Sequence, residues 1–227
     1  MDQNTSELRR AIEVLFEPGD TVELRSFKDR TPVSGYFDNF DELARQATEL
    51  EGRGFAVYVT LNPAKPALLA RARNRLKAYP KATTSDADIL RRSWLPVDLD
   101  PVRPADVSST DSEKQAALRR AREVKGYLME QGWPDPVAGD SGNGAHLLYR
   151  VDLPNDRESL DLVKGVLEAL AFKFSDKAVS VDTSTCNAAR IWKLYGTTAR
   201  KGDSTEERPH RVSGLLEVPE GIEACER

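Results

Sequence analysis

The order of strand and helix patterns after residue 91 constrains the fold of this chain most strongly. Strands are expected at 92–99, 135–139, 145–151 and 179–181. A long helix is expected between the first two strands, from the capping box Thr110–Glu113 to about Gln131, and a second helix begins at Asn155. This β-α-β-β-α-β order is that of split β-α-β folds, and it predicts the α+β class.

The first 90 residues predict a smaller α/β unit. Helices are expected at 6–16, 41–50 and 66–79, and strands at 21–27 and 55–61. We therefore expect an N-terminal α/β subdomain at 1–90, packed as one domain with a subdomain at 91–220 that carries a C-terminal β extension. Residues 221–227 are expected to form a tail.

Composition excludes several classes of protein. With 39% hydrophobic and 31% charged residues, the chain is expected to be soluble, and no apolar run approaches the length of ~20 residues that spans a bilayer. The N-terminus lacks a signal-peptide pattern, so a cytoplasmic location without membrane contact is expected. Cys186 and Cys225 are too few for a structural zinc site.

Asp98 and Asp100 end the first strand of the second subdomain, in the stretch Val97-Asp-Leu-Asp-Pro101. Side chains alternate along a strand, so the two carboxylates share one face and stand about 7 Å apart. Such a pair repels itself when ionised, and hard divalent cations such as Mg²⁺ or Mn²⁺ relieve the repulsion. This arrangement suits metal-assisted phosphoryl or nucleotidyl transfer. Asp-x-Asp-Pro can also simply end a strand and begin a turn.

The expected topology brings a histidine and a third carboxylate toward this pair. The third strand runs antiparallel beside the first, so its start, at His146, should lie near the two aspartates. Asp182, after the fourth strand, is the preferred third carboxylate. Because the fourth strand also runs antiparallel to the first, its beginning is expected to approach Asp98, and Asp176 is therefore a geometric rival.

The loop Ser141-Gly-Asn-Gly-Ala-His146 combines two glycines with hydroxyl and imidazole donors. The backbone at Gly142 and Gly144 can turn amides toward an anion, which together with the Ser141 and His146 donors suits a triphosphate. A glycine-rich β-turn with a surface histidine explains the loop alone equally well. Its expected position beside the aspartates favours phosphate.

Basic residues gather in the C-terminal part of a chain whose net charge is −4. Arg190 and Lys193 lie in a possible strand at 190–196, and Arg200 and Arg211 follow it. Side chains alternate along a strand, so Arg190 and Lys193 can face the same group only if a bulge or the strand end intervenes. Opposite three aspartates, these residues would form a cationic wall for phosphates, although a solvated edge hairpin would carry the same charges.

Three motifs, in this order, resemble those of the archaeo-eukaryotic primase superfamily: Val97-Asp-Leu-Asp100, Ser141-Gly-Asn-Gly-Ala-His146 and Val181-Asp182. Two further segments resemble the primase-polymerase domains of phages, plasmids and bacterial mobile elements: Arg190-Ile-Trp-Lys-Leu-Tyr-Gly-Thr197 and Arg208-Pro-His-Arg211. The resemblance covers about residues 62–216. It implies that residues 91–220 form a catalytic core like an RNA-recognition module (RRM-like).

The resemblance implies template-directed nucleotidyl transfer, as DNA primase, DNA polymerase or both, in replication of such an element. It implies that Asp98, Asp100 and Asp182 bind two Mg²⁺ or Mn²⁺ ions. Ser141, His146 and Lys193 would contact the triphosphate of the incoming nucleotide. Further nucleotide-binding candidates are Gly142, Gly144, Arg190, Arg200 and Arg211.

The expected partners are a DNA template and primer, nucleoside triphosphates and a helicase, fused or separate. Relatives often carry a zinc module, an accessory priming domain or a helicase after this domain. The chain is therefore expected to be the catalytic core alone, as part of a longer protein or as a small enzyme.

Three other functions use similar elements. A metal-dependent nuclease would use the same carboxylates with water as nucleophile. A replication-initiator endonuclease needs paired metal-binding histidines, whereas His146 and His210 are far apart in the sequence. A non-catalytic RRM-like module would carry stacking aromatic residues on the sheet face where Asp98 and Asp100 are expected.

Overall fold

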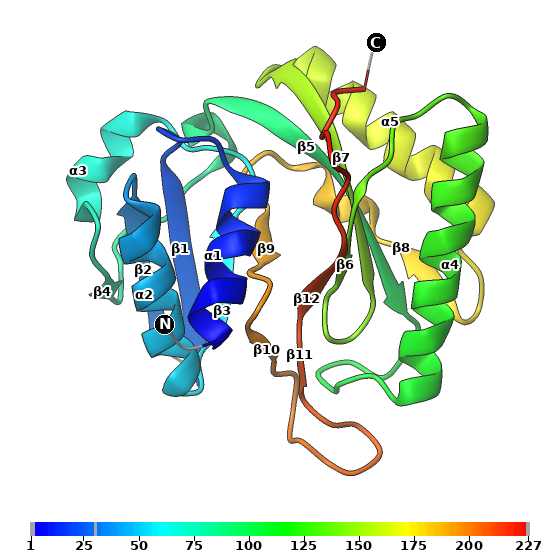
Figure 1. Ribbon diagram of the computed structural model, residues 1–227, viewed down its shortest axis with the longest axis horizontal. Coiled ribbons are helices and arrows are strands. Elements are labelled where there is room, and N and C mark those ends of the chain that lie inside the picture. The colour runs from blue at the N-terminus through cyan, green and yellow to red at the C-terminus, as the bar shows by residue number, and fades with distance from the viewer. Residues whose placement is uncertain (1–2, 30, 226–227) are drawn as a thin grey trace.

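The computed structural model describes residues 3–29 and 31–225, which form two five-stranded sheets, each covered by helices on one face (Figure 1). The strands paired within each sheet run antiparallel. The predicted α+β class is confirmed. Within these two ranges, none of the helices has the combined length and apolar character that crossing a bilayer requires.

The first sheet has the strand order β4-β2-β1-β3-β9. Its strands are β1 (Val22–Lys28), β2 (Thr31–Phe37), β3 (Ala56–Thr60), β4 (Lys77–Ala78) and β9 (Ile191–Lys193). Helices α1 (Gln3–Leu15) and α2 (Phe40–Gly52) cover one face, toward the viewer in Figure 1. Alternation along β1 places Val22 and Leu24 in the core that these helices share with the sheet. The opposite face of β1 therefore carries Arg25 and Phe27.

The second sheet has the order β12-β6-β7-β5-β8 and contains the predicted β-α-β-β-α-β series. The elements of the series are β5 (Arg91–Pro101), α4 (Asp111–Glu130), β6 (Val137–Asp140), β7 (Ala145–Pro154), α5 (Arg157–Phe174) and β8 (Val179–Val181). Helices α4 and α5 pack on one face, where Val97 and Leu99 of β5 join their core. Asp98 and Asp100 therefore lie on the other face of β5.

The C-terminal segment adds short strands and joins the two sheets. After the 3-10 turn η3 (Thr183–Cys186), strand β9 pairs with β3 of the first sheet, with Tyr58 opposite Lys193. The strands β10 (Thr198–Ala199) and β11 (Arg211–Val212) pair with each other. Strand β12 (Gly214–Glu217) then returns to the edge of the second sheet beside β6.

Two parts of the N-terminal half differ from the expectation. The helix expected at 66–79 ends early, because only η1 (Pro66–Leu68) and α3 (Leu69–Ala72) are helical. Asn74 has a left-handed backbone with φ of 47°, after which the chain enters β4 and pairs with β2. Strand β2 itself was not predicted, since its sequence contains a proline and a glycine that disfavour strands in general. A further short turn, η2 (Asp86–Asp88), precedes β5.

Candidate active site

Asp98 and His146 lie directly opposite each other on neighbouring strands. In the register of β5 with β7, Asp98 pairs with His146, and the Nε2 atom of His146 is 3.6 Å from Oδ1 of Asp98. The prediction that the start of the third strand reaches the paired aspartates is therefore confirmed.

Asp182 is the third carboxylate beside this pair, and Asp176 is not. Strand β8 pairs with the last residues of β5, so that Val181 faces Leu99, and the backbone N–H of Asp182 donates to the carbonyl of Asp98 at 2.9 Å. The beginning of β8, near Asp176, does not approach Asp98, because β5 continues to Pro101 rather than ending at residue 99 and the end of β8 therefore reaches Asp98. Asp176 instead accepts from Arg120 of α4 at 2.7 Å.

Of the three carboxylates, Asp98 has the fewest contacts that would stabilise its negative charge. Its Oδ1 atom is buried and has no hydrogen-bond partner among the described residues. Burial raises the pKa of Asp98 well above its usual value, and the negative charges of Asp100 and Asp182 raise it further. Asp100 faces Arg103 at 3.5 Å and Lys201 at 4.0 Å.

Asp100 and Asp182, unlike Asp98, each form ion pairs with arginine or lysine side chains. Asp182 accepts from a guanidinium nitrogen of Arg190 at 2.7 Å and from the N–H of Ser184 at 2.8 Å. As they lie, no three His, Cys, Asp or Glu side chains in residues 3–29 and 31–225 are close enough together to hold one metal ion. The three carboxylates are neighbours, but they do not form a closed set of ligands.

A chain of hydrogen bonds assigns the proton on the His146 ring. The Nε1–H of Trp192 donates to the hydroxyl oxygen of Tyr195 at 3.1 Å, and that hydroxyl lies 2.9 Å from Nδ1 of His146. An indole N–H can only donate, and fully buried Tyr195 has no other acceptor for its proton among the described residues. Nδ1 of His146 therefore accepts, and Nε2–H faces Asp98. Burial lowers the pKa of His146 to about 3, so the ring is neutral near pH 7.

The glycine loop before His146 differs from the expected anion cradle. The N–H of Gly142 donates to Asp140 at 2.7 Å, and the N–H of Gly144 donates to the hydroxyl of Ser141 at 2.7 Å. The two amides are therefore engaged within the loop and do not face the pocket described below. Gly144 serves close packing, because a Cβ there would lie 2.3 Å from the carbonyl oxygen of Leu99.

Replacing Gly144 with Ala is expected to lower the free energy of unfolding by about 1–3 kcal/mol, because the added methyl group collides with backbone of β5. The displaced strand should also weaken whatever activity depends on Asp98 and Asp100. The matched control is Gly165→Ala on α5, where a Cβ meets nothing within 4 Å and helix propensity should add up to about 1 kcal/mol of stability. Urea unfolding of both variants checks the prediction, which fails if Gly144→Ala is as stable as the wild type.

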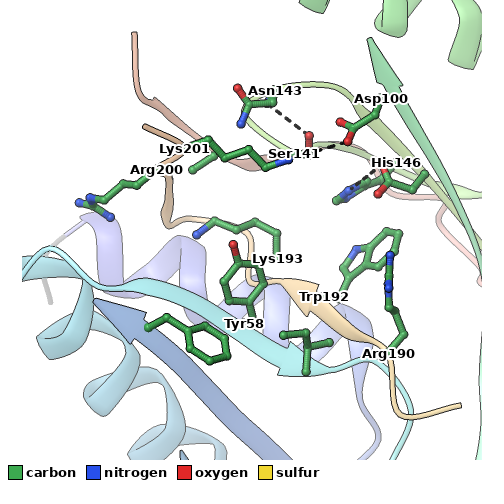
Figure 2. A pocket seen from close by; sticks show the side chains of 14 residues that line it. Tyr58, Asp100, Ser141, Asn143, His146, Arg190, Trp192, Lys193, Arg200 and Lys201 are labelled. Atoms are coloured by element: carbon green, nitrogen blue, oxygen red, sulfur yellow. Dashed lines mark hydrogen bonds and ion pairs between the residues drawn. The ribbon is translucent and has the colours of Figure 1, made fainter. Parts of the chain in front are cut away.

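A pocket of about 380 Å³ lies between the two sheets (Figure 2). The predicted site residues that line it are Asp98, Asp100, Ser141, His146, Arg190, Lys193 and Arg200. The lining residues that were not predicted as site residues are Phe27, Tyr58, Asn143, Ile191, Trp192, Ala199 and Lys201. Figure 2 shows Asp100 and His146 on one side of the pocket and Tyr58 and Lys193 on the other.

Arg190 and Lys193 reach this one pocket because the strand is short. Strand β9 covers only 191–193, so Arg190 lies just before the strand and is not bound by its alternation. Arg190 and Lys193 can therefore both line the pocket, as expected if a strand end lies between them. The Lys193 side chain is buried, and its ammonium donates to the carbonyl of Thr198 at 2.8 Å. Burial lowers the pKa of Lys193 to about 7. An anion beside the ammonium would therefore favour its charged form.

Arg200 and Arg211 do not form the free cationic wall that was expected. Both terminal nitrogens of Arg200 pair with the Glu51 carboxylate, at 2.8 and 2.9 Å. Arg211 lies outside the pocket lining and donates to Asp111 at 2.6 Å. These partners lie far away in the sequence, so the pattern of basic residues alone could not reveal that their charges are already balanced.

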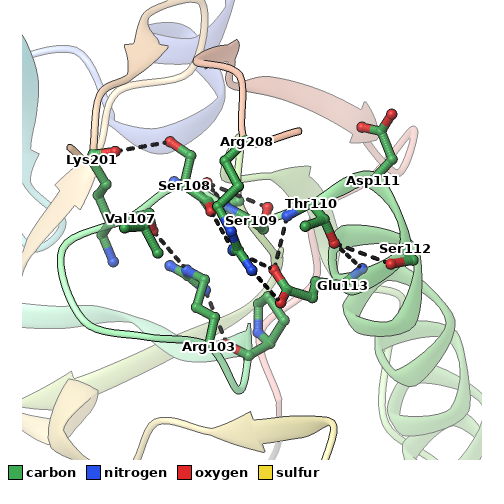
Figure 3. A network of polar contacts seen from close by, with 12 residues as sticks. Arg103, Val107, Ser108, Ser109, Thr110, Asp111, Ser112, Glu113, Lys201 and Arg208 are labelled. Carbon is green, nitrogen blue, oxygen red and sulfur yellow. Dashed lines mark hydrogen bonds and ion pairs between the residues drawn. The ribbon is translucent and has the colours of Figure 1, made fainter. Parts of the chain in front are cut away.

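Lys201 was overlooked as a site residue, and a polar network holds its segment in place (Figure 3). Ser108 donates to the carbonyl of Lys201 at 3.2 Å, and Arg208 forms a two-point ion pair with Glu113 at 2.9 and 3.0 Å. Glu113 also completes the capping box with Thr110 that starts α4. The network therefore ties the segment 200–211 to the N-terminus of α4 and keeps the Lys201 side chain near Asp100. The signal that could have found Lys201 is its place in the basic run that begins at Arg190.

Comparison with known proteins finds similarity in structure but not in sequence. No protein-family model matches the chain, and no curated protein matches it significantly. The crystal structure of primase RepB′ superposes with a TM-score of 0.53 at 12% identity, covering 95% of this chain and 56% of that chain. The catalytic domain of primase RepB′ in complex with initiator DNA gives a TM-score of 0.52 at 13% identity, covering 95% of this chain and 85% of that one. The chain thus has the fold of a primase catalytic domain.

Proposed function

We propose that this chain is a nucleotidyltransferase that adds nucleotides on a DNA template, as a primase, a polymerase or both, in replication of a plasmid, phage or mobile element. The observation that carries the proposal is the buried Oδ1 atom of Asp98, which has no hydrogen-bond partner among the described residues. Asp98 shares a pocket with Asp100, His146 and Lys193, on a fold found in primase structures. Acidic groups on one wall and cations on the other are what a metal-bound triphosphate requires.

The carboxylates fit Mg²⁺ or Mn²⁺ as the metal. Asp98 and Asp100 present hard oxygen donors on one strand face, and Asp182, which is paired with Arg190, would be the third ligand. Burial, and then repulsion by Asp100 and Asp182, raise the pKa of Asp98, and a divalent cation beside it would offset that cost of ionisation. When bound, two such ions would favour ionisation of the primer 3′-hydroxyl and stabilise the leaving pyrophosphate.

The remaining pocket residues would bind the triphosphate. His146 offers the Nε2–H donor, and Lys193 and Lys201 supply positive charge for the phosphates. Ser141 and Asn143 add polar side chains at the rim of the same pocket. These groups would stabilise negative charge that develops on the phosphates during transfer.

Manganese binding is expected to stabilise the wild-type protein against heat. At 100 times the dissociation constant the gain is about 2.7 kcal/mol, because the ion binds the folded state only. The double variant Asp98→Asn/Asp100→Asn should lose this gain, whereas Asp152→Asn, an exposed aspartate on β7, should keep it. Thermal unfolding with Mn²⁺ and with EDTA measures the effect. If Mn²⁺ raises the melting temperature of the wild type and of the double variant equally, the proposed metal site is wrong.

Primer extension tests the function itself. A labelled primer on a DNA template, supplied with deoxyribo- or ribonucleoside triphosphates and Mg²⁺ or Mn²⁺, should grow in template-directed steps, and EDTA should stop it. A reaction with template but no primer tests whether the protein synthesises a primer de novo. A reaction without nucleotides reports cleavage. Shortening of the primer in place of growth would identify a nuclease and overturn the proposal. A primer whose length does not change would also overturn it.

A further inference from the structure

One wall of the pocket has no part in the chemistry proposed above. Phe27 of β1 and Tyr58 of β3 line the pocket from the first sheet, and their ring centroids are 6.1 Å apart. Phe27 is 38% exposed, although most large apolar side chains of the first sheet are buried. Figure 2 shows Tyr58 on the side of the pocket that faces Asp100 and Ser141.

The alternation of the strands explains why these rings lie outside the core. Val57 and Val59 of β3 point into the core under α1 and α2, so Tyr58 points to the opposite face. Phe27 shares that face on β1. The hydroxyl of Tyr58 makes no hydrogen bond within the part of the chain that the structure describes. Phe27 is the more open ring of the pair, since Tyr58 is partly buried, and an exposed aromatic ring gains free energy when another flat ring covers it.

The position of the rings relative to the cations indicates what would cover them. The ammonium of Lys193 lies 5.2 Å from the centre of the Tyr58 ring, on the neighbouring strand of the same sheet. A molecule whose phosphates meet Lys193 therefore has its other end beside the aromatic wall. A nucleoside triphosphate has this construction, with an anionic chain at one end and a planar base at the other.

We propose that Phe27 and Tyr58 form a stacking platform for the base of the bound nucleoside triphosphate. The proposal rests on the proposed function, because it places the triphosphate at the same pocket. Stacking on a ring face accepts all four bases, since every base has a flat π-face. A template-directed enzyme benefits from such contact, because the template and not the pocket must then select the base.

The test compares nucleotides with inorganic tripolyphosphate, which lacks the base. For Phe27→Ala, calorimetry with Mn²⁺ should show about 5- to 150-fold weaker binding of dATP and dTTP, the range expected for losing one stacked base. The affinity for tripolyphosphate should stay unchanged. Phe27→Trp should retain nucleotide binding, and Phe27→Leu should lose it although its apolar bulk remains. The matched control is Phe172→Ala on α5, where the residue is 94% exposed and is not part of the pocket lining.

The other outcomes have defined meanings. Equal loss of nucleotide and tripolyphosphate affinity in both Phe27→Ala and Phe27→Leu would assign Phe27 a structural role and overturn the platform. Unchanged nucleotide affinity together with weaker binding of a single-stranded oligo(dT) would assign the rings to the template strand and also overturn it. If base-dependent binding is seen but primer extension is absent, the platform stands and the proposed transfer activity falls.

Discussion

Replacing Asp98 with Asn is expected to lower nucleotide incorporation by about 10³-fold or more and, in the metal-free protein, to raise the melting temperature. Activity should fall because the carboxylate that we propose as a metal ligand loses its charge, and a bound metal ion contributes several kcal/mol of transition-state stabilisation. Stability rises because the charged form of Asp98 is disfavoured by burial and by Asp100 and Asp182. For a domain of this size, each 1 kcal/mol corresponds to about 2–4 °C. Primer extension and thermal unfolding in EDTA measure the two effects.

The pH dependence of stability should change in the same variant. The folded-state pKa of Asp98 is raised, so its contribution to stability is fully present below the unfolded value and is lost as pH rises through the folded value. Wild-type protein in EDTA should therefore gain stability from this group as the pH falls from 7 toward 4. In Asp98→Asn this component should vanish and the curve of melting temperature against pH should become flatter.

Asp176 provides the matched control for Asp98. Arg120 and two backbone N–H groups hold the pKa of Asp176 at about 2, so its negative charge is stabilising. Asp176→Asn should therefore lower the melting temperature at pH 7 and leave incorporation unchanged, which is the opposite pattern to Asp98→Asn. Loss of incorporation in Asp176→Asn with retained activity in Asp98→Asn would show that the wrong aspartates were assigned.

Replacing His146 with Ala should lower incorporation by about 10²–10³-fold, the usual effect of removing one donor that stabilises developing charge. Tyr195→Phe should cause a smaller loss of about tenfold, because the ring of His146 stays but the hydroxyl that fixes its proton is gone. The sequence contains two histidines, so ¹⁵N spectra can be assigned with a His210→Ala variant. In wild type, the His146 signals should show a protonated Nε2, and in Tyr195→Phe a mixture of tautomers.

Tyr149→Phe is the control for this pair of variants. Tyr149 is a buried tyrosine whose hydroxyl has no hydrogen-bond partner among the described residues. Its removal should leave incorporation unchanged and stability equal or slightly higher. If Tyr195→Phe loses activity while the ¹⁵N signals of His146 stay as in wild type, Tyr195 acts through packing and not through the histidine proton.

The sequence alone was sufficient to locate the central contact of the site. Alternation along β5 placed Asp98 and Asp100 on one face, and the split β-α-β order placed His146 opposite them. Both inferences depend on backbone geometry that every strand and every such topology shares. The choice between Asp182 and Asp176 needed the structure, because it turned on the two residues by which β5 continues beyond the predicted strand end.

The partners of the basic residues were beyond the reach of the sequence. Arg200 meets Glu51 and Arg211 meets Asp111, each at a sequence distance of 100 residues or more. A linear pattern shows that charges gather, but only the fold shows which of them are already paired. Phe27 was missed for a related reason, since an apolar residue at a strand end gives no sign of the sheet face that helices leave uncovered.

The pairing of β9 with β3 affects how the two sheets can move relative to each other. Trp192 and Lys193, which line the pocket, belong to strand β9, which pairs with β3 in the first sheet. The strands β8 before it and β12 after it belong to the second sheet. The chain therefore crosses between the two sheets near residue 90, before β9 and again after β9, and these three crossings restrain movement of one sheet relative to the other. Lys201, whose side chain is 47% exposed, marks a solvent-facing part of the rim of the pocket that lies between these sheets.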